Sequence, residues 1–125
     1  MPYSRNEVDL IGHVGNIEIK TREGNGKEFA VVSIATSDRW KKDGETQEKT
    51  SWHRVVVFSP RTVKFISDYL KKGRYVNVRG ALDYYDYEDE SGNKTYVTQI
   101  ICRQLDVLDR KKDDGEPDAP NDDNH

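Results

Sequence analysis

Apolar and polar residues alternate along much of this chain, and that period of two constrains its fold more than any other feature. Val8, Leu10 and Val14 show the alternation first. Four later segments are rich in β-branched and aromatic residues, at 29–36, 51–58, 75–82 and 96–102. Because successive side chains of a β-strand point to opposite faces, each segment predicts a strand. Gly12 and Gly15 within the first one predict a sharp bend or bulge.

One segment departs from this period. It begins with Ser59 and Pro60, a pair typical of a helix N-cap and first helical position. Apolar residues then recur at helical spacing, at Val63, Ile66 and Leu70. The last turn and its stop are expected at two lysines and a glycine, Lys71, Lys72 and Gly73. We therefore expect one short amphipathic helix of about three turns.

The segments between the strands are polar and rich in turn residues. We expect a turn at 22–27, a polar loop at 40–49 and a long hairpin arm at 83–95. Five strands with a helix between the third and the fourth are the order of an OB-fold, a partly open five-stranded Greek-key barrel. The expected fold class is therefore all-β, with this barrel in residues 1–108.

Charge is unevenly distributed along the 125 residues. The net charge is −3, but six of the 23 acidic residues lie in 113–125, which hold no Lys or Arg. Over 1–112 the 20 basic residues therefore outnumber the 17 acidic ones. A weakly basic body suits a polyanionic ligand, although a mixed surface with an acidic end explains the charge equally well. We expect residues 109–125 to form a disordered acidic tail.

The third strand carries the most informative side chains. By alternation, one face presents Trp52, Arg54, Val56 and Phe58, and the other presents His53, Val55 and Val57. A guanidinium between two aromatic rings suits a phosphate or a base plane, and stacking on exposed rings accepts any base. The alternative is that both rings belong to the core while the arginine lies at its rim.

Two further segments favour the first interpretation. Trp40 lies beside basic residues in the polar loop, Arg39, Lys41 and Lys42. The hairpin arm adds four tyrosines, Tyr84, Tyr85, Tyr87 and Tyr96. Single-strand binders combine aromatic and basic residues in this way.

The acidic residues of the arm oppose phosphate binding. Their alternation resembles a calcium loop, but Gly92 and Val97 occupy the wrong places for its glycine and its bidentate glutamate.

Residue types for catalysis or metal binding are few. The histidines, His13, His53 and His125, are scattered, and Cys102 is the single cysteine. The sequence contains neither a Cys/His/Asp cluster with metal-ligand spacing nor a glycine-rich phosphate loop. We therefore expect no enzymatic activity, no metal and no cofactor. The apolar runs fall short of the roughly 18–20 residues of a membrane span, so we expect a soluble intracellular protein.

Five segments together resemble the bacterial and mitochondrial single-stranded DNA-binding protein family. They cover about residues 6–108 in the family's order: 6–15 (NEVDLIGHVG), 33–40 (SIATSDRW), 50–58 (TSWHRVVVF), 69–73 (YLKKG) and 78–82 (VRGAL). The resemblance implies an OB-fold that assembles as a homotetramer with single-stranded DNA wrapped around it. It also implies a nucleoid-associated protein of the cytoplasm. A mitochondrial matrix protein or a phage protein in a bacterial host is the alternative.

The resemblance implies roles for individual residues. Base stacking falls to Trp40, Trp52 and Phe58, and Tyr87 stands where bacterial members commonly have a tryptophan. Arg54 and Lys72 match residues that contact the DNA backbone, and His53 matches a position in the subunit contact. We expect the other phosphate-neutralising residues to be Arg39, Lys41, Lys42 and Lys71.

Three departures from the family pattern affect affinity and partners. Glu7 stands where a basic residue is common, and the hairpin arm is unusually acidic. The long Gly/Gln-rich linker is missing, and the sequence closes on NDDNH without the apolar final residues that dock replication and repair proteins. These features predict lower affinity per subunit and argue against recruitment of such partners through the tail.

We expect a non-enzymatic, sequence-tolerant binder that coats and protects single-stranded DNA during replication, recombination and repair. One alternative is a protein-interaction OB module, which predicts binding without salt dependence or tryptophan quenching. The other is a metal-dependent OB-fold nuclease, which predicts degradation of single strands with divalent metal. RNA binding also stays open, because stacking platforms do not read the 2′-hydroxyl.

Overall fold

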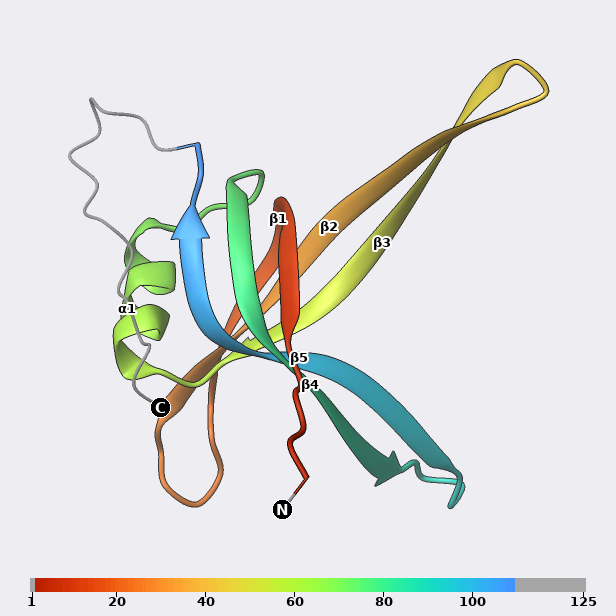
Figure 1. Ribbon diagram of the computed structural model, residues 1–125. Helices are drawn as coiled ribbons and strands as arrows, with labels where there is room; N and C mark the ends of the chain where they lie inside the picture. The colour runs from red at the N-terminus through yellow and green to blue at the C-terminus, as the bar shows by residue number, and fades with distance from the viewer. Residues whose placement is uncertain (1, 110–125) are drawn as a thin grey trace.

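Six elements make up the computed structural model, which describes residues 2–109. They are β1 (Val8–Thr21), β2 (Glu28–Lys42), β3 (Glu45–Val57), α1 (Pro60–Tyr69), β4 (Tyr75–Glu88) and β5 (Lys94–Val107). The strands form a closed barrel in the order β1-β2-β3-β5-β4, drawn in Figure 1. The prediction of an all-β OB-fold with one helix between the third and fourth strands is confirmed. The predicted acidic tail, apart from Asp109, lies outside the described residues.

Strand β1 bends so that it serves two neighbours. Its first half pairs with β4 as far as His13, and its second half pairs with β2. The register shifts between Val14 and Ile17, which is the irregularity that the glycines predicted. On the opposite side of the barrel, β3 and β5 close it through a short parallel seam of two residue pairs, Val55↔Ile100 and Val56↔Ile101.

The core lies inside the barrel and under α1, which covers one side of it at the left of Figure 1. Alternate residues of the strands point inward, and the largest fully buried side chains include Ile34, Val55, Val78 and Leu105. From α1, Val63, Phe65 and Ile66 join this cluster. Full burial of one such side chain contributes about 1.5–3 kcal/mol to folding. The alternate strand residues that point into the core therefore stabilise the barrel.

Two ribbons project from the barrel in different directions (Figure 1). Strands β2 and β3 stay paired out to Lys42↔Glu45, and β4 and β5 stay paired out to Glu88↔Lys94. The prediction of a polar loop at 40–49 is therefore wrong. The ribbon is stabilised by opposite charges across the strands, as between Arg39 and Glu48 at 3.7 Å. Asp43 and Gly44 supply the positive φ angles, 52° and 80°, of its tight turn.

Helix α1 begins as predicted and ends earlier. Ser59 is its N-cap residue and Pro60 its first residue, although the Ser59 side chain makes no capping hydrogen bond. Leu70 is extended and buried, so Lys71 and Lys72 follow the helix and do not lie in its last turn. Gly73, with φ 95°, belongs to the next turn, in which the Arg74 amide donates to the Lys71 carbonyl. No helix of residues 2–109 is long and apolar enough to cross a membrane.

An ion pair joins the start of β4 to the end of β5. Arg74 Nε donates to Asp109 Oδ1 at 3.0 Å, and the Tyr75 amide donates to Asp109 Oδ2 at 3.1 Å. Burial raises the pKa of the Asp109 carboxyl, but these hydrogen bonds and the charge of Arg74 outweigh it and hold that pKa below its ordinary value. This tie therefore stabilises the barrel at neutral pH and is lost as pH falls through the lowered pKa.

Candidate nucleic-acid interface

The outer surface of β2 and β3 carries a row of aromatic and cationic side chains, here called the outer face. On β3 it consists of Trp52, Arg54 and Val56, and the row continues to Phe58 just beyond the strand. The Trp52 side is open to solvent, since that residue is 63% exposed. Val55 and Val57, on the other face, are buried in the core. The two faces differ as the alternation predicted, because Val55 and Val57 join the core cluster and Trp52 does not, but Val56 on the outer face is buried as well, at 2% exposed.

Trp52 lies directly against the backbone of β1. A Cβ added at Gly15 would collide with the six-membered ring of its indole. Gly15 belongs to the bulge of β1, so the bulge and the missing side chain together let the indole rest on the strand. This position holds one broad, flat, exposed ring on a rigid barrel wall.

Arg54 is oriented by a chain of two hydrogen bonds. Its Nε donates to Gln99 Oε1 at 3.2 Å, and Gln99 Nε2 donates to Asp83 Oδ2 at 2.9 Å. Asp83 therefore helps to hold the guanidinium in place, through Gln99, where the sequence predicted only repulsion of phosphate. These two hydrogen bonds run from β3 to the base of the β4–β5 arm, so they also join the outer face to that arm.

Phe58 is packed from two sides. Its ring lies 5.8 Å from that of Phe29, tilted by 39°, and the Arg22 guanidinium lies over it at 4.5 Å from its centroid. Sequence reasoning missed both neighbours. Phe29 could have been found by extending the alternation of the second strand, because it shares the outer face with Val31 and Ser33. Arg22 carried no local signal, since it lies in a turn distant in sequence from Phe58.

Trp40 does not join Trp52. In the β2–β3 register Ala35 pairs with Trp52 and Trp40 pairs with Gln47, so the two tryptophans lie on opposite faces of the ribbon. Trp40 is nevertheless 47% exposed. Among the predicted cations of this ribbon, Arg39 contacts Glu48, Lys42 pairs with Glu45, and Lys41 pairs with the uncharged Thr46.

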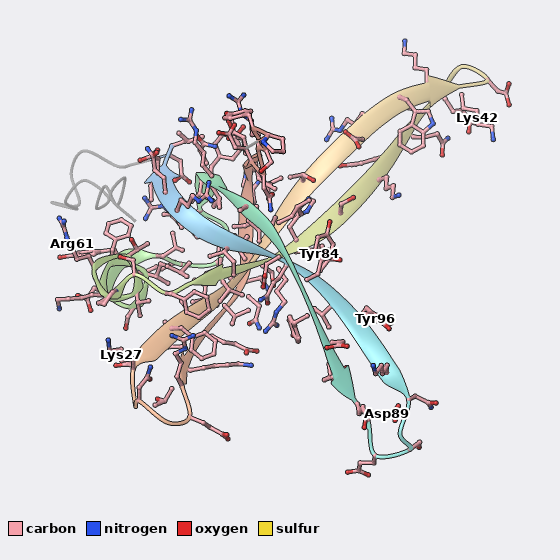
Figure 2. All side chains as sticks on the ribbon, turned by 60° about the horizontal axis from the view of Figure 1, so that its bottom comes forward. Lys27, Lys42, Arg61, Tyr84, Asp89 and Tyr96 are labelled. Carbon is pink, nitrogen blue, oxygen red and sulfur yellow. The ribbon has the colours of Figure 1, made fainter. Side chains whose placement is uncertain are left out.

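The tyrosines of the β4–β5 arm divide between its two faces. Tyr85 and Tyr87 alternate with Asp83 and Gln99 on the face that carries the Arg54 hydrogen-bond chain. The register puts Tyr84 and Tyr96, both labelled in Figure 2, on the reverse face. All four are exposed. The structure therefore places only one pair of arm tyrosines beside the outer face.

The acidic tip of this arm folds on itself. Asp89 Oδ1 accepts the backbone amides of Ser91 and Asn93, each at 2.9 Å, and so caps the turn. Within the part of the chain that the structure describes, no group of three or more His, Cys, Asp or Glu side chains is placed to hold a metal ion.

The loop with the two lysines after α1 is hydrogen-bonded to the strand that supports Trp52. The Gly73 amide donates to the Val14 carbonyl at 2.8 Å, and the next residue of β1 is Gly15, which supports the indole. Lys71 and Lys72 are both exposed. His53 lies on the other face of β3, half-buried, with its Nε2 2.8 Å from Thr36 Oγ1.

An OB-fold barrel with exposed aromatic rings and cations on its outer wall defines the class of oligonucleotide-binding barrels. Residues 5–108 match the model of the single-strand binding protein family. The chain belongs to that family.

Known proteins resemble the chain over most of its length. Single-stranded DNA-binding protein 1 of Xylella fastidiosa (strain 9a5c) is 40% identical over 113 residues, which cover 88% of this chain and 82% of that protein. The single-stranded DNA-binding protein of Rickettsia typhi is 39% identical over 118 residues, 89% of this chain and 77% of that protein. A solved complex of Plasmodium falciparum SSB with ssDNA has a TM-score of 0.77 at 36% identity, and the match covers 87% of this chain and 99% of that one.

Proposed function

We propose that this chain binds single-stranded DNA without sequence preference, and that it coats and protects exposed strands during DNA replication, recombination and repair. The observation that carries the proposal is the exposed Trp52 indole, fixed on the barrel wall beside Arg54 in a member of the single-strand binding protein family. The relatives support a role in binding rather than in catalysis.

Stacking explains the preference for single strands. A base inside a duplex has its faces covered by its neighbours, whereas an unpaired base can lie flat on an exposed ring. Every base has such a face, so the contact tolerates any sequence. Trp52 and Tyr87 supply exposed rings on the side of the Arg54 hydrogen-bond chain, and Trp40 supplies one on the reverse of the β2–β3 ribbon.

Charge supplies the rest of the affinity. Five exposed cations lie along the β2–β3 ribbon or directly follow α1, Arg39, Lys41, Lys42, Lys71 and Lys72. Each phosphate that they neutralise releases a counterion, so affinity falls as salt rises. Because Arg39 and Lys42 face carboxylates across the ribbon, Lys41, Lys71 and Lys72 contribute most of this effect.

Self-association is part of the proposal. The resemblance implies a homotetramer, with His53 at a subunit contact. An exposed apolar surface on neighbouring strands supports association of copies: Ile11 is 52% exposed, and Tyr75 and Leu108 are also open to solvent. The bacterial relatives favour a compartment that holds DNA, the bacterial cytoplasm.

The test is binding of oligo-dT and of a matched duplex at two salt concentrations. We expect the tryptophan emission to be quenched by oligo-dT alone, with weaker binding at high salt. Trp52→Ala should lower the affinity for labelled oligo-dT by about 5- to 100-fold, because one stacked base is worth about 1–3 kcal/mol. Tyr96→Ala, an exposed aromatic on the reverse face of the arm, serves as the control and should stay within about twofold.

Equal affinity of Trp52→Ala and the parent would show that the outer face is not the stacking surface. Binding that is insensitive to salt and leaves tryptophan emission unchanged would favour a protein partner. Degradation of the oligonucleotide with added divalent metal would indicate a nuclease.

A further inference from the structure

Of the residues that the proposed function assigns to DNA binding, Phe58 alone also lines a second surface feature, on the side of the molecule that carries α1. It is a groove of about 550 Å³ between the β1–β2 turn and α1. One wall comes from the turn, with Arg22 and Lys27, and the other from α1, with Val63 and Lys64. Figure 2 labels Lys27 on this turn and Arg61 on the helix, on the same side of the molecule and away from both arms.

The groove continues the outer face. Phe58 ends the row that begins with Trp52, and it also lines the groove. A strand that follows the outer face past Arg54 therefore reaches the groove next. Its size falls in the range of pockets that take a small ligand.

The chemistry of the groove fits a nucleotide. Arg22, Lys27 and Lys64 line it, against two carboxylates, Glu28 and Asp68. Asp68 is already paired with Lys64 at 3.1 Å. Three apolar residues, Phe58, Pro60 and Val63, also line it. Cationic and apolar side chains in one groove suit a phosphate with an attached base.

Arg22 determines how a base can be held there. Its guanidinium already covers the Phe58 ring at 4.5 Å, and Phe29 packs against that ring as well. A base therefore meets the guanidinium plane before the phenyl ring. Guanidinium planes stack on nucleobases as aromatic rings do. The backbone of Arg22 is fixed by the turn, since its amide donates to the Lys27 carbonyl at 2.7 Å.

We propose that this groove binds one nucleotide of the same DNA strand, with its base stacked on the Arg22 guanidinium and its phosphate beside Lys27. The proposal rests on the proposed function and adds a site to it. It makes Arg22 the outermost plane of a stack that continues through Phe58 to Phe29.

The experiment compares Arg22→Ala, Arg22→Lys and Arg61→Ala with the parent protein, using labelled oligo-dT at two salt concentrations. Arg22→Lys keeps the charge but removes the plane. We expect both Arg22 variants to lower affinity by about 5-fold or more, and only Arg22→Ala to flatten the salt dependence. Arg61→Ala is the matched control, because Arg61 is an exposed arginine of α1 that does not line the groove. It should bind like the parent.

Each of the other outcomes contradicts one part of the proposal or of the proposed function. Normal affinity in both Arg22 variants would place the groove off the path of the DNA. A loss in Arg22→Ala that Arg22→Lys restores would leave a plain phosphate contact and refute the stack. Failure of the parent to bind oligo-dT, or of Trp52→Ala to weaken it, would instead refute the proposed function, so the two failures are distinguishable. Thermal unfolding of each variant checks that the barrel is intact.

Discussion

At the scale of single residues, two glycines of β1 lie in close contact with different groups, one with backbone and one with a side chain. A Cβ at Gly12 would collide with the backbone carbonyl of Ala35, and one at Gly15 would collide with the indole of Trp52. A backbone carbonyl in a sheet cannot move without breaking the ladder, whereas an exposed side chain can rotate. The same substitution should therefore damage folding at one position and binding at the other.

We expect Gly12→Ala to lower the free energy of unfolding by about 1–3 kcal/mol, because it crowds a packed ladder. Gly15→Ala should change that free energy by less than about 1 kcal/mol and lower the affinity for oligo-dT by about 5-fold, because the indole is displaced. Denaturant unfolding and oligonucleotide titration measure the two effects.

A double variant separates the direct effect from the indirect one. If Gly15 acts only through the indole, Gly15→Ala should have no further effect on affinity in a Trp52→Ala background. An additional loss in that background would assign Gly15 its own contact with the strand.

At the scale of elements, the barrel strands were predictable and the ribbons were not. Burial imposes a period of two wherever a strand lines the core, and that period is visible in Val76 and Val78. The outer ends of β2 and β3 cover no core, so their residues are polar, as in the register pairs Asp38↔Lys49 and Arg39↔Glu48. A polar segment without a period of two resembles a loop in the sequence. The contact of Arg22 with Phe58 joins segments far apart in the chain, so no local sequence pattern predicts it.

The two faces of the β4–β5 arm should differ in function. Tyr85 and Tyr87 lie on the face that joins the outer face through Gln99, and Tyr84 and Tyr96 lie on the reverse. Replacing the first pair with alanine should lower affinity for oligo-dT by about 10-fold, whereas replacing the second pair should leave it within about twofold. The two double variants remove the same atoms, so each controls for the other. A larger loss of affinity in the Tyr84 and Tyr96 double variant would show that the DNA contacts the opposite face of the arm.

At the scale of the whole molecule, the separation of surfaces matters most. The outer face exposes Trp52 and Arg54 on one side of β3, and His53 points to the other side of that strand. One strand can therefore serve a nucleic acid and a second copy of the chain at the same time. The homotetramer that the resemblance implies stays a prediction.

We expect His53→Asp to shift the mass in solution from four chains to one or two, because burying an unpaired carboxylate at a subunit contact is strongly unfavourable. Analytical ultracentrifugation measures the shift. Thr36→Val is the control, because it removes the 2.8 Å contact with His53 but adds no charge. A tetramer that survives His53→Asp would place the contact elsewhere, and a monomeric parent would refute the tetramer.

The two-pair seam between β3 and β5 bears on the order in which the chain folds. The ribbons β2–β3 and β4–β5 each join neighbouring segments, so their ladders can grow from the turns. The seam joins Val55 to Ile100, and α1 and the whole of β4 lie between them. Closing so long a loop lowers the conformational entropy of the chain before the contacts of those two pairs can form and stabilise it. We therefore expect the seam to form late and to set the folding rate, so that changes in arm length leave that rate nearly unchanged.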